Sequence, residues 1–89
     1  MKLVFQPEAW EDVCHWAVTD RAMFKRLRKL IDDTCRDPYD GIGKPEPLKH
    51  ELAGAWSRRI DSEHRLVYLI RTASGGEAEL VILQARYHY

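Results

Sequence analysis

The sequence has no long apolar stretch. A transmembrane helix needs about 20 consecutive apolar residues, and no run in the 89 residues approaches that length. The first residues, MKLVFQPEAWED, lack the apolar core of a secretory signal peptide. We therefore expect a cytoplasmic protein with no membrane partner.

Metal, nucleotide and covalent-nucleophile motifs are absent as well. Cys14 and Cys35 match no metal-ligand or redox spacing, and the segment HEL is followed by no second histidine at helical spacing. The sequence contains no Gly-x-Ser-x-Gly or Ser-x-x-Lys motif and no glycine loop after a strand. We expect no metal and no cofactor. We interpret both cysteines as packing residues of helices, with a disulfide the less favoured alternative.

The sequence also has no excess of either charge, because 14 Lys and Arg residues balance 14 Asp and Glu residues. The distribution is nevertheless uneven. Residues 21–36 are rich in basic side chains, and a second basic group is spread over the middle of the chain. Polyanion binding depends on local patches rather than on net charge, so a nucleic-acid partner is not excluded.

The first part of the sequence has two segments of helical period. Residues 2–5 predict a short strand, and Pro7 suits the first turn of a helix. The apolar stripe of that helix is predicted from residues at helical spacing, with Trp16 at its edge: Trp10, Val13, Cys14, Ala17 and Val18. Thr19-Asp20 predicts a helix break with a new N-cap. A second helix, ended by Asp37-Pro38, is predicted to bury Met23, Phe24, Leu27, Leu30, Ile31 and Thr34.

After residue 37 the pattern changes. Residues 37–55 are rich in glycine and proline and predict a loop. Residues 56–60 and 64–71 alternate like strands joined by a tight turn, residues 72–77 form a second hairpin connection, and residues 78–89 are predicted as the last strand. The order β-α-α-β-β-β predicts an α+β fold, with a helical hairpin packed on a mainly antiparallel twisted sheet in one domain of residues 1–89.

Acid, base and guanidinium groups are concentrated in the second half. Glu46 lies between two prolines that stiffen its loop. Arg65 lies in an apolar strand, where an arginine is costly unless it is paired or lines a cleft. Histidine, here His88, ionises near neutral pH. From the residues alone, ordinary interpretations stay open: an exposed loop glutamate, an arginine in an ion pair with Glu46, Asp61 or Glu63, and solvated terminal aromatic residues.

Four contiguous motifs resemble a known family. KPEPLKH, WSRRI, EHRLVY and RYHY occur in that order, and together they are similar to YoeB/Txe-type toxins of the RelE/ParE superfamily of toxin–antitoxin systems. The resemblance extends from MKLVF to the last residue. One departure is the last hairpin, RTASGGEAEL, which is longer than is usual in the family. Insertions at loop tips are well tolerated, and this one leaves the motifs intact.

The resemblance implies a ribosome-dependent mRNA interferase that cuts the message in the ribosomal A site. Its catalytic residues map onto Glu46, Arg65, His88 and Tyr89, and phosphate-holding residues map onto Lys49 and Arg59. Such an enzyme uses the 2′-hydroxyl of RNA as nucleophile and leaves a 2′,3′-cyclic phosphate. Further RNA contacts are expected from Tyr87 by stacking and from the basic helix face, which includes Lys25 and Lys29.

The same resemblance implies the partners. They are the 70S ribosome with its mRNA, a YefM/Axe-type antitoxin, and a second copy of the chain in a homodimer. Trp16 and Trp56 are candidates for a dimer contact, although core packing is the preferred interpretation for both. Two alternatives are a ParE-like toxin that binds DNA gyrase without nuclease activity, and an inactive partner-binding module.

Overall fold

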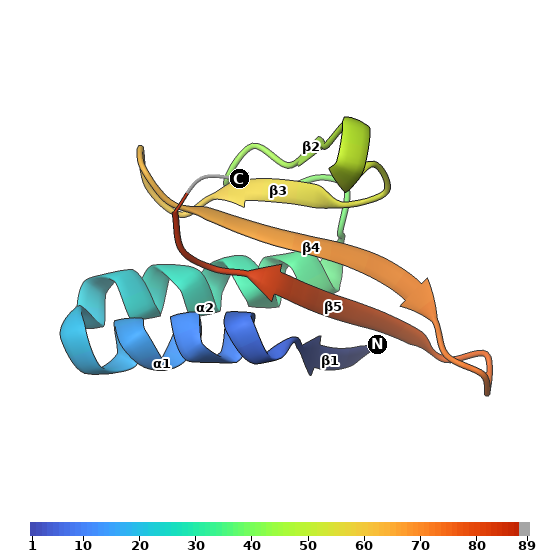
Figure 1. Cartoon of the computed structure of the whole chain (residues 1–89), viewed down its shortest axis with the longest axis horizontal. Helices are drawn as coiled ribbons and strands as arrows, with labels where there is room; N and C mark the ends of the chain where they lie inside the picture. Colours follow the sequence, from blue (N-terminus) through green and yellow to red (C-terminus); the bar gives the residue numbers. More distant parts are fainter. Residues whose placement is uncertain (88–89) are drawn as a thin grey trace.

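The computed structural model describes residues 1–87. Two helices cover one face of a twisted five-stranded sheet (Figure 1). In chain order the elements are β1 Lys2–Phe5, α1 Pro7–Thr19, α2 Arg21–Arg36, β2 Glu46–Pro47, the 3₁₀ turn η1 His50–Leu52, β3 Trp56–Arg59, β4 Arg65–Thr72 and β5 Ala78–Gln84. The predicted α+β class and the helical hairpin on a mainly antiparallel sheet are therefore confirmed.

The strand order is β1-β5-β4-β3-β2. Among the described residues, only β1 and β5 pair in parallel, and the other neighbours are antiparallel. The prediction of a plain loop over residues 37–55 is wrong, because Glu46 and Pro47 pair with Ser57 and Trp56. Proline is tolerated in β2 because this strand lies at the edge of the sheet, where the missing N–H costs no ladder hydrogen bond. A strand of only two residues, one of them proline, has no alternating pattern from which it could be predicted.

The second helix follows the sequence prediction closely. Asp20 caps it by accepting a hydrogen bond from the N–H of Met23 at 3.2 Å. The predicted apolar face packs against the sheet, where Leu27, Leu30 and Thr34 are buried with strand residues such as Leu66. Within the described part of the chain, no helix is long and apolar enough to cross a membrane.

The first helix buries only part of the predicted stripe: Val13 and the edge residue Trp16 pack in or against the core. Ala9 and Trp16 are its buried residues, whereas Trp10 is 55% exposed and Val18 is 85% exposed. Cys14 is also exposed, so its interpretation as a packing residue is wrong, while Cys35 packs against the core. Apolar residues are distributed all around this short helix, so its packing against the sheet determines that the face with Trp16 is buried. The indole N–H of Trp16 donates to the carbonyl of Ala85 at 2.8 Å.

The last strand is shorter than predicted, because it ends at Gln84 instead of continuing to residue 89. The reason lies in the next peptide group. The N–H of Ala85 donates to the Asp12 carboxylate at 3.0 Å, and its carbonyl accepts from Trp16. Side chains of α1 thus take the hydrogen bonds that a longer ladder with β4 would need. Residues 85–87 form the C-terminal segment, which turns away from the strand.

Candidate active site

One face of the sheet carries the predicted acidic and basic residues. Ser57 of β3 lies opposite Glu46, and Arg59 lies opposite Arg65. Paired residues project to the same face, as do residues two apart on one strand. Glu46, Arg59 and Arg65 therefore share a face, and the alternate positions of β4 project into the core against the helices. The structure brings these three predicted residues together on the face opposite the helices.

Glu46 stands on the exposed edge strand β2 (Figure 1). Its backbone surroundings are tightly bent, because Lys44 has φ 52° and His50 has φ 59°. Left-handed conformations of non-glycine residues are unfavourable and occur often at functional sites. An open cavity of about 430 Å³ is lined by residues 46–52. Lys49 and Glu46 are both among the residues that line it.

Arg65 begins β4 and is partly buried. Its Nη1 donates to the carbonyl oxygens of Asp61 at 3.0 Å and of His64 at 3.1 Å. Among the described residues it makes no ion pair with Glu46, Asp61 or Glu63, which the ordinary interpretation required. These two hydrogen bonds hold one arm of the guanidinium and leave the rest of the fork for another acceptor.

The turn between β3 and β4 fixes the start of β4. The Asp61 carboxylate accepts hydrogen bonds from the N–H of Glu63 at 2.8 Å and of His64 at 2.7 Å. Partial burial of this carboxyl raises its pKa, but the two hydrogen bonds outweigh that effect, and the pKa of Asp61 is lowered. An ionised Asp61 thus closes the turn that places His64 and Arg65.

Tyr87 belongs to the C-terminal segment and is 56% exposed. Its N–H donates to Nδ1 of His64 at 2.7 Å, and its carbonyl accepts from the N–H of Arg65 at 3.1 Å. The guanidinium of Arg86 lies over its ring, 4.6 Å from the centroid. The structure therefore brings Tyr87 to the start of β4 beside Arg65. The other two predicted terminal residues, His88 and Tyr89, lie outside the described residues.

A fully buried arginine supports the loop that leads to Glu46. The Arg58 side chain donates to the carboxylate of Asp33 at 2.7 Å, to the hydroxyl of Tyr68, and to three carbonyl oxygens of the loop, those of Asp37, Asp40 and Ile42. Arg58 is not among the site residues predicted from the sequence. Strand alternation offered the signal, because Arg58 and Arg59 must project to opposite faces of β3.

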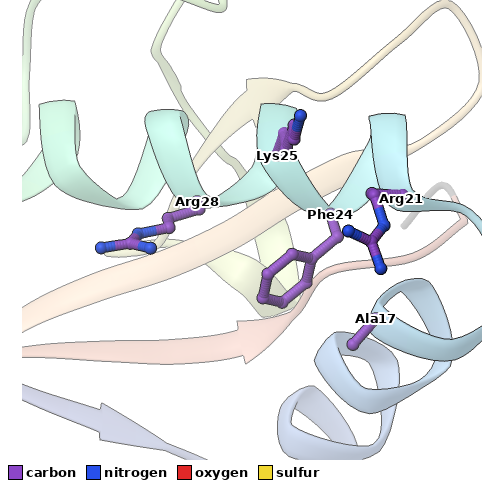
Figure 2. Close-up of a pocket in the computed structure, with 5 residues that line it drawn as sticks. All are labelled: Ala17, Arg21, Phe24, Lys25 and Arg28. Carbon is purple, nitrogen blue, oxygen red and sulfur yellow. The ribbon is translucent and has the colours of Figure 1, made fainter.

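The basic face of α2 lies on the helix side of the molecule. Lys25 lines a cavity of about 330 Å³ with Arg21, Phe24 and Arg28, and Ala17 of α1 completes it. Figure 2 shows the Phe24 ring between the two arginines. Lys29 is exposed on the same helix. The predicted residues Lys25 and Lys29 are thus not brought together with Glu46 and Arg65, and Arg21 and Arg28 extend this basic surface.

The chemistry available on the Glu46 face is that of a carboxylate and two guanidinium groups. A carboxylate can accept a proton, and guanidinium forks bind the oxygens of a phosphate in bidentate fashion. Within residues 1–87, His, Cys, Asp and Glu side chains form no group of three or more that could hold a metal ion.

Comparisons with known proteins define the class. Residues 5–89 match the family model described as YoeB-like toxin of bacterial type II toxin-antitoxin system. Toxin YoeB of Streptomyces coelicolor is 54% identical, with all of both chains covered. The structure of a YoeB/ParE toxin from Agrobacterium tumefaciens superimposes with a TM-score of 0.93 at 44% identity, again over the whole of both chains. The fold and sequence are those of a toxin of a toxin–antitoxin system. The chain belongs to the YoeB toxin family.

Two other similar structures show assemblies. One is the YoeB dimer from Staphylococcus aureus, with a TM-score of 0.87 and 38% identity. The other is a heterotetrameric YoeB–YefM toxin–antitoxin complex from the same organism, with a TM-score of 0.83 and 38% identity. Each covers all of this chain, and this chain covers 98% of each.

Proposed function

We propose that this toxin is a ribosome-dependent endoribonuclease that cuts mRNA in the ribosomal A site. The observation that carries the proposal is the sharing of one sheet face by Glu46, Arg59 and Arg65, with Tyr87 held beside Arg65. A base and phosphate-binding cations on one exposed face are what cleavage by the RNA's own 2′-hydroxyl requires. Membership of the YoeB family supports the same activity.

In the proposed reaction Glu46 removes the proton from the 2′-hydroxyl. The 2′ oxygen attacks the adjacent phosphorus, and the bond from phosphorus to the 5′ oxygen of the next nucleotide breaks. His88 donates a proton to that departing oxygen, so the products are a 2′,3′-cyclic phosphate and a 5′-hydroxyl. The free donors of Arg65 stabilise the charge on the non-bridging oxygens, and Tyr89 orients the nucleotide. As drawn, the route uses only side chains of the toxin and the 2′-hydroxyl of the RNA, in keeping with the expectation of no cofactor and no metal.

The remaining predicted residues bind RNA in this proposal. Lys49 and Arg59, both exposed, hold phosphates next to the scissile bond. Tyr87 is exposed enough for its ring to stack on a base. Lys25 and Lys29, with Arg21 and Arg28, form a separate basic surface suited to ribosomal RNA. Because Phe24 is also part of it, the surface offers both charge and an aromatic ring.

The proposed partners follow from the two assemblies of relatives. A YefM/Axe-type antitoxin is expected to neutralise this chain, and a homodimer is expected in its absence. Trp16 is buried and Trp56 packs against the core, which favours the core interpretation for both. Since its substrate is on the ribosome, the toxin acts in the cytoplasm.

A gyrase-binding role is the competing function, because one structural neighbour carries the description YoeB/ParE. Binding gyrase requires neither a general base nor a phosphate clamp on one face. Primer extension on mRNA translated in vitro, with and without the toxin, separates the two roles. We expect new 5′ ends at A-site codons, and no cutting of the same RNA without ribosomes. Intact mRNA together with inhibition of gyrase supercoiling would refute the nuclease proposal.

A further inference from the structure

The last described residue is held on both sides. Tyr87 has φ 64°, a left-handed conformation that is unfavourable for a non-glycine residue and persists only where its surroundings impose it. The surroundings are two hydrogen bonds: the Tyr87 N–H donates to His64 Nδ1 at 2.7 Å, and the Tyr87 carbonyl accepts from the Arg65 N–H at 3.1 Å. The conformation of Tyr87 is therefore set by His64 and Arg65.

His64 is itself fixed in place. Its side chain is 12% exposed, and its ring meets the Trp16 ring edge to face at 4.9 Å. The Asp61 carboxylate accepts its backbone N–H. Trp16 in turn donates its indole N–H to the carbonyl of Ala85. Two aromatic side chains thus bind the C-terminal segment at two points, one at Ala85 and one at Tyr87.

The hydrogen bond to Tyr87 defines the tautomer of His64. A backbone N–H can only donate, so Nδ1 must be the acceptor and the ring proton must lie on Nε2. Nε2 is 3.7 Å from the carboxylate of Glu63, which favours a proton at that nitrogen. The nitrogen of His64 that could act as a base is therefore occupied by the backbone N–H of Tyr87, and this histidine does not serve as the general base.

We infer that His64 is a positioning residue for the reaction proposed above, and the inference rests on that proposed function. By holding Tyr87, its Nδ1 fixes the point from which the chain continues to His88 and Tyr89, the proposed acid and its neighbour. Misplacement of a catalytic group by about 1 Å can cost about 100-fold in rate. Loss of the Nδ1 acceptor therefore lowers the cleavage rate although His64 touches no substrate.

Two substitutions separate the acceptor from the ring. His64→Asn places an amide oxygen close to the position of Nδ1 but removes the ring, whereas His64→Phe keeps a ring against Trp16 and removes the acceptor. We expect the Phe variant to lose about 10- to 100-fold in single-turnover cleavage on ribosomes, with ribosome binding unchanged, and the Asn variant to recover most of the rate. His15→Phe is the matched control, because the His15 ring also meets Trp16 edge to face, at 4.7 Å, on the helix itself.

A folded His64→Phe variant with wild-type rate, or an Asn variant as slow as the Phe variant, would overturn the inference. Nitrogen NMR of the unmodified protein tests the contact without any substitution. We expect His64 in the Nε2–H tautomer and a scalar coupling between the Tyr87 amide nitrogen and Nδ1 across the hydrogen bond. Absence of that coupling would also overturn it. A wild-type toxin that leaves translated mRNA intact refutes the proposed function instead, and the coupling then still decides whether His64 holds Tyr87.

Discussion

The Arg65 side chain is held in place by one arm of its guanidinium group. Nη1 is bound to the carbonyls of Asp61 and His64, which orients the planar fork so that its other donors are available to a phosphate. A lysine in the same place has no second arm to offer, so arginine and lysine are not equivalent there. The strand position and the guanidinium geometry together make Arg65 the central cation of the proposed site.

Arg65→Ala is expected to lower the rate of mRNA cleavage by about 100- to 1,000-fold, the usual cost of removing one transition-state donor. The fold should survive, because the lost hydrogen bonds are part-buried bonds to carbonyls and cost about 1 kcal/mol each. Arg71→Ala is the matched control: it lies on the same face of β4 at the other end and pairs with Glu79 at 2.7 Å. Single-turnover cleavage and thermal melting measure both effects. A fully active Arg65→Ala protein would show that Arg65 is structural only.

Glu46→Gln is expected to lower the cleavage rate by about 100- to 10,000-fold, because it removes the proposed base while keeping the shape of the side chain. The exposed position of Glu46 means that melting should be unchanged. Glu51→Gln in the same cavity is the control and should cut normally. Equal rates for both variants and the wild-type protein would remove Glu46 from the mechanism.

Most residues of the candidate site could be predicted from the sequence, but only through the family motifs. Residue types alone left Glu46 and Arg65 open to ordinary interpretations, since the pairing of β2 with β3 is not visible in a segment rich in proline and glycine. The roles of Arg58 and His64 went unnoticed for a related reason. Each depends on partners more than 20 residues away, Asp33 for Arg58 and Tyr87 for His64.

At the scale of elements, the end of α2 and the following loop form one unit with β3. Asp33 accepts from Arg36 at 3.0 Å, from the N–H of Ile42 at 3.0 Å and from the buried Arg58 at 2.7 Å. These hydrogen bonds, from Arg36 first, hold the pKa of Asp33 well below its usual value of 3.8. Gly43 closes against this unit with φ 79°, and an added Cβ there would lie 2.7 Å from the Leu30 side chain.

The pKa of Asp33 is lower in the folded chain than in the unfolded chain. The ionised carboxylate of Asp33 therefore stabilises the fold at every pH above the pKa that Asp33 has in the unfolded chain. That stability should be lost progressively as the pH falls from about 5 toward the lower folded value. Asp33→Asn is expected to unfold more easily at pH 7 and to show a shallower loss of stability below pH 5. Asp32→Asn, one residue away and exposed, is the control. Urea unfolding between pH 7 and pH 2.5 measures this, and parallel pH profiles for the Asp33→Asn and wild-type proteins would contradict the assignment.

Local pattern predicted the elements best where one face is plainly apolar. The face of α2 was predicted correctly, and so were β4 and the start of β5, because their periods are unambiguous. In α1 apolar residues surround the helix, so docking against the sheet decided which were buried. The end of β5 depended on Asp12 and Trp16 of α1, contacts that no local pattern could reveal.

In the whole molecule, the sheet lies between the basic surface of the helices and the face that carries the proposed active site. The helices and their basic side chains lie on one side, and Glu46, Arg59 and Arg65 project from the other. The β4–β5 hairpin extends at the end of the sheet away from the C-terminal segment (Figure 1). The insertion that the sequence predicts in this hairpin would therefore lie away from the proposed site.

Deletion of residues 88 and 89 tests the site at the scale of the whole toxin. The C-terminal segment is held at Ala85 by Asp12 and Trp16 and at Tyr87 by His64, so the shortened protein should keep its fold and its melting temperature within a few degrees. It should lose toxicity, because a general acid typically contributes about 100- to 10,000-fold, and Tyr89, which orients the nucleotide in the proposed reaction, is lost as well.

His88→Gln provides the matched control for chain length, since it removes only the acid. We expect it to be nearly as harmless as the deletion when expression is induced in growing cells, and both proteins should still bind antitoxin through the helices and sheet. Co-purification with a YefM-type antitoxin and thermal melting would establish that each variant is folded. Continued growth arrest by a folded deletion protein would show that the terminal residues supply no acid, and a gyrase supercoiling assay would then be the decisive measurement.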